Sequence, residues 1–93
     1  MRAKIDYELT MLKEFGKDLR MPHSEHLKDE IFQLRIQVAN DISRILYFFY
    51  SGEEIILTNG FVKKTRTTPP KEIETAKKYY SDYLERMRRN GNF

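Results

Sequence analysis

The stretch EIFQLRIQVANDISRILYFFY, residues 30–50, holds two apolar-rich segments joined by a short polar connection. In the first segment, 30–38, apolar and polar residues alternate with a period of two, which is typical of a half-buried strand. The second segment, 42–50, is almost continuously apolar, β-branched or aromatic, which predicts a strand covered on both faces. AND, residues 39–41, predicts the turn between them. The stretch therefore predicts an antiparallel hairpin.

Two more elements are predicted after this hairpin. IILTNGFVK, residues 55–63, follows the turn segment SGEE and reads as a third strand, which makes an antiparallel meander. Pro69 and Pro70 suit the first turn of a helix, and Thr68 is the expected N-cap. The helix should present an apolar stripe formed by Ile73, Ala76, Tyr80, Tyr83 or Leu84, and Met87.

One helix is predicted before the hairpin. Ile5, Leu9 and Leu12 have the spacing of an amphipathic helix, and Gly16 is a suitable C-terminal cap. The following segment, 17–29, breaks both periodicities and contains a proline, so a loop is expected there. The chain is thus predicted to be one α+β domain over residues 1–93, with an N-terminal helix, a three-stranded antiparallel meander and a C-terminal helix.

Charge is distributed unevenly along the chain. Residues 1–52 hold eight basic and eight acidic side chains, whereas 61–93 hold nine basic and four acidic ones. This asymmetry favours a polyanionic partner near the C-terminal part. The absence of cysteine excludes disulfides, thiolate chemistry and thiolate metal sites. No signal-peptide core or membrane-spanning apolar run is present, so a cytoplasmic protein without membrane contact is expected.

The two histidines, His23 and His26, lie in the expected loop. With Glu25 between them they could ligate a metal, but no third protein ligand is evident from the sequence. Exposed loop residues are the preferred interpretation, and neither a metal nor another cofactor is expected. The sequence also lacks a glycine-rich phosphate loop and a nucleophile elbow.

Basic side chains are expected to meet at one end of the meander. Arg35 lies on the polar face of the first strand, Arg44 begins the second, and Lys63 and Lys64 end the third. Together they could bind a phosphodiester, since arginine grips phosphate bidentately and lysine supplies a compact charge. The alternative is ion pairing of the arginines across strands, with Glu30, Asp41 or Glu54 as partners.

The aromatic run LYFFY, residues 46–50, also has two interpretations. Its rings could stack on bases, as in sheet-based RNA binders. Alternation places Tyr47 and Phe49 on the face opposite to Phe48 and Tyr50, so at least half of the run must be core. Core packing is therefore the preferred interpretation.

Three segments taken together resemble a known family. They are LKDEIFQLRI, ISRILYFFY and IILTNGFVKKTRTTPPKEIETAKKYYSDYL. Their succession resembles the phage-derived branch of the RelE/HigB toxin superfamily, and the resemblance runs from about Ile5 to Leu84. It implies a toxin of a type II toxin–antitoxin pair, which binds the ribosomal decoding site and cleaves mRNA by a metal-free attack of a ribose 2′-hydroxyl on the adjacent phosphate.

The resemblance also implies roles for individual residues. Arg44 is expected to bind the phosphate or stabilise its added charge, with Arg35 and Lys63 or Lys64 assisting. The further residues expected to contact RNA are Thr65, Arg66, Gln33, Gln37 and Tyr79. The implied partners are mRNA on the ribosome and a cognate antitoxin of the helix-turn-helix type.

The sequence departs from the family pattern in three places. Asn59 stands where a histidine often precedes Gly-Phe, and Ile73 stands where some members carry a tyrosine, a role that Tyr79 could fill. The first strand and helix of the superfamily fold are expected to be missing, which would expose a sheet edge and allow a homodimer through it. These departures keep a second interpretation open, a non-catalytic module or inactive remnant that binds RNA or the antitoxin and acts as a corepressor.

Overall fold

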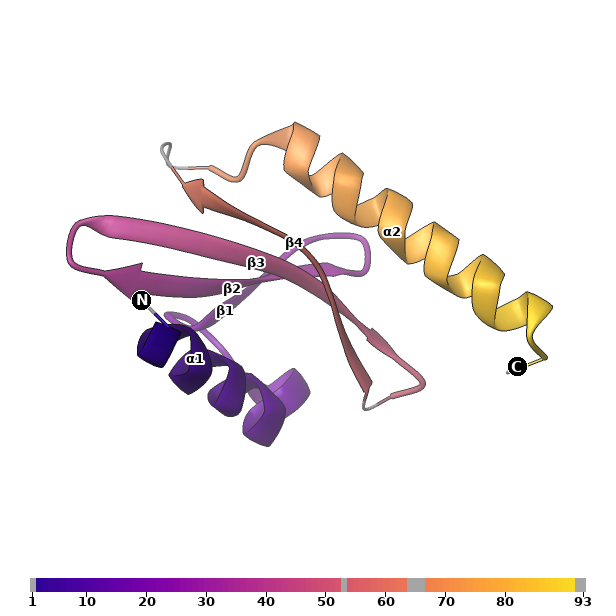
Figure 1. Ribbon diagram of the computed structural model, residues 1–93, viewed down its shortest axis with the longest axis horizontal. Coiled ribbons are helices and arrows are strands. Elements are labelled where there is room, and N and C mark those ends of the chain that lie inside the picture. The colour runs from indigo at the N-terminus through magenta and orange to yellow at the C-terminus, as the bar shows by residue number, and fades with distance from the viewer. Residues whose placement is uncertain (1, 53, 64–66, 92–93) are drawn as a thin grey trace.

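A computed structural model describes residues 2–52, 54–63 and 67–91. The elements, in chain order, are α1 (Arg2–Phe15), the 3₁₀ turn η1 (Gly16–Asp18), β1 (Ser24–Lys28), β2 (Ile31–Val38), β3 (Asp41–Tyr50), β4 (Glu54–Lys63) and α2 (Pro70–Arg89). Within the described ranges the strands form one antiparallel sheet in the order β1-β2-β3-β4. The two helices lie on opposite sides of it (Figure 1). The predicted α+β fold with a helix at each end is confirmed.

The predicted three-stranded meander is corrected to a sheet of four strands in the described part of the chain. The additional strand, β1, lies inside 17–29, where a loop was expected. Glu25 and His26 pair with Gln33 and Phe32 of β2, although SEHLK has little apolar alternation. This segment becomes a strand because its backbone pairs with β2. The N–H and C=O groups on this edge of β2 would otherwise be unpaired, and the local sequence alone does not predict the pairing.

The face of the sheet toward α1 carries the first part of the core. Leu12 of α1 packs with Leu34 of β2 and Tyr47 of β3, and all three are fully buried. Gly16 follows the last residue of α1 with φ of 51°, a left-handed conformation that glycine adopts without strain, so the predicted cap is confirmed. The predicted apolar stripe of this helix is incomplete, however, because Glu8 is also buried on this face.

The opposite face carries the second part of the core, under α2. Ile31, Leu46 and Phe48 are buried together with Ala76 of the helix. The rings of Tyr80 and Tyr83 meet that of Phe48 edge-on, at centroid distances of 4.8 Å and 5.6 Å, so the predicted stripe of α2 is confirmed at these positions. The aromatic run of β3 is therefore mainly core, as preferred.

The start of α2 differs from the prediction. Pro69, not Thr68, is the N-cap residue, and the Thr68 hydroxyl donates instead to the side-chain oxygen of Gln33 over 2.6 Å. Asn59 of β4 donates its amide to both the backbone oxygen (3.2 Å) and the carboxylate (2.9 Å) of Glu72. These bonds fix the beginning of α2 against β2 and β4.

Both edge strands of the described sheet carry irregularities. The register of β4 shifts by one residue against Ile45 and Tyr47, which leaves Thr58 and Asn59 in a bulge, and the Thr58 hydroxyl donates to the Leu46 oxygen. The register of β1 shifts between His26 and Lys28. Bulges twist an edge and hinder its pairing with another chain. Pairing of two copies through an edge stays a prediction.

Candidate functional site

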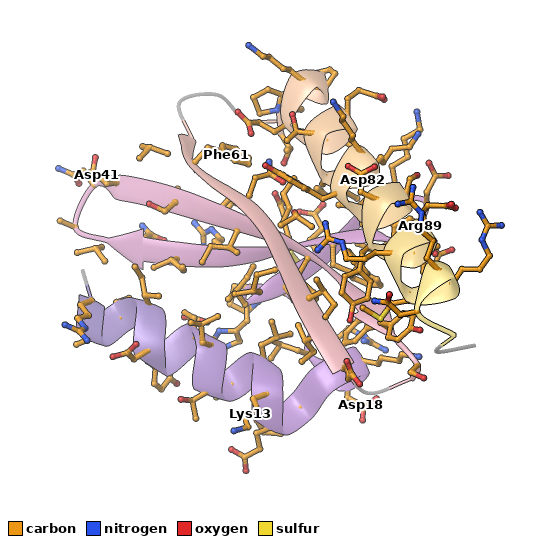
Figure 2. The ribbon with its side chains drawn as sticks, turned by 45° about the vertical axis from the view of Figure 1, so that its right-hand side comes forward. Lys13, Asp18, Asp41, Phe61, Asp82 and Arg89 are labelled. Carbon is orange, nitrogen blue, oxygen red and sulfur yellow. The ribbon has the colours of Figure 1, made fainter. Side chains whose placement is uncertain are left out.

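The end of the sheet near the turn between β2 and β3 carries several polar side chains on the face toward α2. Arg35 of β2 lies directly opposite Arg44 of β3 in the strand register. Glu25 of β1 lies opposite Gln33, the next residue of β2 on this face. Asp41, at the turn that ends this part of the sheet, lies far from Arg89 at the end of α2 (Figure 2). Hairpin pairing thus gathers residues that are distant in sequence.

Arg44 is the most unusual side chain of this group. It is only 5% exposed, yet its Nε and Nη1 atoms have no hydrogen-bond partner among the residues that the structure describes. Burial lowers the pKa of the Arg44 guanidinium, the neighbouring positive charge of Arg35 lowers it further, and Glu25 acts in the opposite direction. Buried donors are normally satisfied, so Nε and Nη1 can each still donate to an acceptor.

A cavity of about 410 Å³ opens beside Arg44. Its lining comes from the loop before β1 and from three strands, and consists of Met21, Pro22, Ser24, Glu25, Gln33, Arg35 and Arg44. It therefore contains two guanidinium groups and one carboxylate. The expectation that Arg35 and Arg44 lie side by side holds in this structure, and the cavity is where a ligand could reach both.

A chain of hydrogen bonds fixes the carboxylate side of the cavity. The amide nitrogen of Gln33 donates to Glu25 Oε1 over 2.9 Å, while the amide oxygen of Gln33 accepts from Thr68. Gln33 is 3% exposed, so both ends of its amide are used inside the protein. Gln33 thus orients Glu25, which is itself exposed to solvent.

The basic residues expected from β4 are only partly described. The backbone of Lys63 pairs with Ile42, which also pairs with Gln37, so these three positions lie in one row next to the row of Arg35 and Arg44. Gln37 is exposed there. The side chain of Lys63 and all of Lys64, Thr65 and Arg66 lie outside the described residues.

Tyr79 does not join this group. It is 51% exposed and lines a different cavity of about 330 Å³ between α2 and β4, together with Thr58, Asp82 and Arg86. Asn59, at the position where the family pattern has a histidine, is engaged with Glu72 and not with the arginines.

The two histidines make separate contacts. His23 Nδ1 lies 2.9 Å from Glu8 Oε1, and His26 Nε2 donates to the backbone oxygen of Asp29 over 2.5 Å. Over the described ranges, no three His, Asp or Glu side chains are grouped so that they could hold a metal ion.

Sequence reasoning missed the place of Glu25 in this cavity. The sequence predicts a loop over 17–29, in which Glu25 is only a neighbour of two histidines. Once SEHLK is paired with β2, Glu25 necessarily falls on the same face as Gln33 and next to the arginines. The signal was the register, which local sequence does not provide.

The arrangement suits an anionic ligand that carries a dissociable proton nearby. Two guanidinium groups can bind phosphate oxygens bidentately, and such charge-assisted bonds are the stronger kind. A carboxylate beside them can accept a proton from a hydroxyl group of the same ligand. A ribonucleotide phosphodiester has both features.

The chain matches the model of a known protein family. The family model described as "Phage derived protein Gp49-like (DUF891)" matches residues 1–81, which is most of the chain. No curated protein matches the sequence. Neither of the helices in the described ranges has the length and apolar character that crossing a membrane requires.

Proposed function

Because the chain belongs to the phage-derived Gp49-like family, we propose that it is a toxin-like protein whose Arg44 cavity binds an RNA phosphodiester for cleavage. The observation that carries the proposal is the buried guanidinium of Arg44, with Nε and Nη1 lacking a partner among the described residues. Arg35 lies opposite it, and like charges at such a position repel each other unless an anion lies between them. A phosphodiester would supply that anion.

In the proposed reaction, Glu25 accepts the proton of a ribose 2′-hydroxyl whose oxygen attacks the adjacent phosphorus. The bond from phosphorus to the 5′-oxygen breaks, which leaves a 2′,3′-cyclic phosphate on one fragment and a 5′-hydroxyl on the other. The departing 5′-oxygen takes its proton from Lys63 or Lys64. Arg44 and Arg35 stabilise the charge that accumulates on the phosphate oxygens.

The other expected residues take supporting parts in this proposal. Gln37 and the backbone position of Lys63 share a row beside the arginines, which is a suitable path for the RNA chain. Thr65 and Arg66 are proposed to contact the RNA beyond it. Gln33 is assigned to orienting Glu25, since its amide is already engaged, and Tyr79 to an RNA contact outside the cavity.

The biological setting follows the RelE/HigB resemblance. We propose mRNA on the ribosome as the substrate, in the cytoplasm, and a helix-turn-helix antitoxin as the neutralising partner. A second copy bound at a sheet edge is a further proposed partner, although the bulges in β1 and β4 restrict how much of either edge can pair.

Controlled expression in cells followed by mapping of mRNA 5′ ends tests the proposal. The unaltered protein should arrest growth and create new 5′ ends inside reading frames, and Arg44→Met should do neither. Arg89→Met is the matched control, because it removes one exposed positive charge from the end of α2 and should behave like the parent. Growth arrest by Arg44→Met equal to that of the parent would rule out the catalytic assignment. A parent protein that binds the antitoxin without arresting growth would instead be the non-catalytic corepressor.

A further inference from the structure

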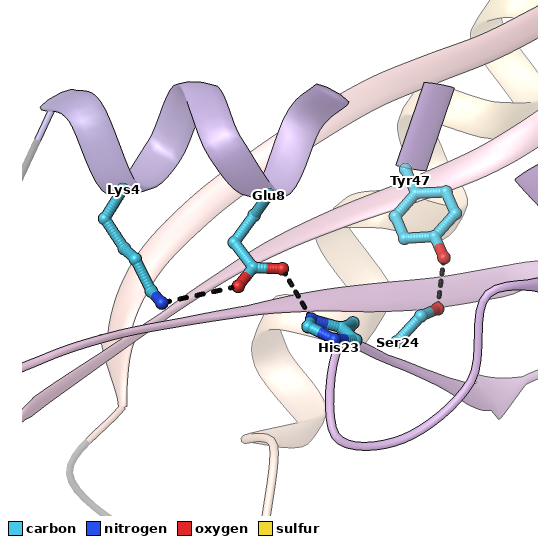
Figure 3. Close-up of polar contacts among 5 residues, drawn as sticks. All are labelled: Lys4, Glu8, His23, Ser24 and Tyr47. Carbon is cyan, nitrogen blue, oxygen red and sulfur yellow. Dashed lines mark hydrogen bonds and ion pairs between the residues drawn. The ribbon is translucent and has the colours of Figure 1, made fainter. Parts of the chain in front are cut away.

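The loop before β1 is attached to α1 by a buried carboxylate. Glu8 of α1 is only 4% exposed, and its two oxygens are directed at His23 Nδ1 (2.9 Å) and, at longer range, at Lys4 Nζ (3.9 Å; Figure 3). Because the carboxylate only accepts, Nδ1 of His23 carries the proton of this bond. A carboxylate removed from water requires such partners, so the position of His23 is tied to that of α1.

The two residues after His23 are attached to other elements. The Ser24 hydroxyl shares a hydrogen bond with the Tyr47 hydroxyl of β3, and Glu25 accepts from Gln33 of β2. Three consecutive side chains therefore bind three different elements of the fold. In addition, the backbone oxygen of His23 accepts from the Arg35 nitrogen over 2.8 Å.

The attached segment is also one wall of the cavity. Met21 and Pro22, just before His23, and Ser24 and Glu25, just after it, all line the space beside Arg44. The lining thus continues on both sides of the residue that Glu8 holds. A displacement of His23 would move this wall and the carboxylate relative to the guanidinium groups.

We infer that Glu8 and His23 are positioning residues, which set the distance of Glu25 and the cavity wall from Arg44 by linking α1 to the start of β1. The inference rests on the proposed function for its catalytic consequence, but the link itself is a property of the fold. It gives α1 a part in the site although the helix lies on the opposite side of the sheet from the cavity. A partner that bound α1 would then reach the site through this pair.

The test uses the full chain with three substitutions. Glu8→Ala removes the acceptor, whereas Glu8→Gln keeps an oxygen that can accept from His23. Leu9→Ala is the control, because Leu9 lies on the same helix and packs on the same core without a polar contact to the loop. For each variant, kcat and KM are measured for cleavage of a short mRNA bound to ribosomes, and the side-chain amide resonances of Gln33 are recorded by NMR on the protein alone.

We expect Glu8→Ala to shift the Gln33 amide resonances and to lower kcat about tenfold with little change in KM, since misplaced groups cost rate more than binding. Glu8→Gln should retain most of the rate, and Leu9→Ala should leave both readouts near those of the parent. Combining Glu8→Ala with His23→Ala should be no worse than either alone, because the two act as a unit.

Unmoved Gln33 resonances in Glu8→Ala, or an equal loss of kcat in Leu9→Ala, would overturn the inference. Failure of the proposed function has a different signature, namely that the unaltered protein cleaves no RNA. In that case the Gln33 resonances alone decide whether Glu8 positions the cavity wall.

Discussion

Glu8 and Arg44 are buried to nearly the same degree, at 4% and 5% exposure, on opposite faces of one sheet. Glu8 has His23 and Lys4 within reach of its oxygens. Arg44 faces a second arginine, and its Nε and Nη1 find no partner in the described part of the chain. The carboxylate of Glu8 is thus satisfied by other residues of the protein, whereas Arg44 retains two donors for the phosphate that we propose it binds.

Arg44→Met tests the proposed ligand-binding role of Arg44 and should have the largest effect. The loss of one preorganised cation should reduce RNA cleavage by about 100-fold or more. The same change should raise the free energy of unfolding by about 1 kcal/mol, because it replaces a desolvated charge beside Arg35 by an apolar chain of similar size. Single-turnover kinetics and urea unfolding measure the two effects. If Arg44→Met lowered both the free energy of unfolding and the cleavage rate, the role of Arg44 would be structural.

Glu8→Ala tests the structural role of the buried carboxylate, and its effect on stability should have the opposite sign to that of Arg44→Met. Removing the acceptor leaves the His23 donor without its partner and opens space under α1, at a cost of about 1–3 kcal/mol. Thermal unfolding monitored by circular dichroism should show a lower Tm than for the parent, and Glu8→Gln should recover most of the difference. Equal Tm values for parent and Glu8→Ala would contradict the structural role of the pair.

Arg35→Ala removes the positive charge that faces Arg44 across the two strands. The lost phosphate contact should weaken binding of a non-cleavable RNA by about tenfold and reduce the slope of log K against log salt by about one. The pKa of Arg44 should rise, since the neighbouring cation no longer opposes its charge. Fluorescence anisotropy at several salt concentrations gives the affinity and slope, and an unchanged slope would exclude a phosphate contact by Arg35.

Tyr47→Phe concerns the hydrogen bond that anchors Ser24 and should have the smallest effect, about 1 kcal/mol. Burial raises the pKa of Tyr47 above its ordinary value, so the folded state holds this proton more tightly than the unfolded state does. The stability that this raised pKa contributes is fully present below about pH 10, the ordinary pKa of tyrosine, and is lost as the pH rises through the folded-state pKa. The free energy of unfolding should therefore fall less steeply for the variant than for the parent between about pH 9 and 11. Denaturant unfolding at several pH values across that range measures the difference. If the free energy of unfolding depended on pH in the same way in both proteins, Tyr47 would not be the cause of the stability loss at alkaline pH.

Much of the fold could be predicted because its signals are local. The alternation in 31–38, the apolar run in β3 and the turn at 39–40 fix one hairpin, and the register of that hairpin alone places Arg35 opposite Arg44. The stripe and the prolines of α2 likewise define a helix without knowledge of its neighbours.

The rest depends on contacts between distant segments. β1 forms because its backbone pairs with the edge of β2. The sequence of β1 is too polar to predict a strand by itself. Glu8 and His23 are 15 residues apart, a spacing that belongs to no helical or strand period. The cavity could not be predicted from the sequence for the same reason, since only the pairing of β1 with β2 brings Glu25 next to Arg44.

We propose that the buried guanidinium of Arg44 binds a phosphodiester. An NMR titration of the full chain tests this proposal, with a trinucleotide that carries a 2′-O-methyl group at the central ribose and with the Arg44 Nε–Hε resonance followed. We expect a saturable downfield shift of this resonance, with the same affinity as the overall binding, and no further RNA-dependent shift when excess inorganic phosphate already fills the site. RNA binding that leaves the Arg44 resonance unmoved would contradict it.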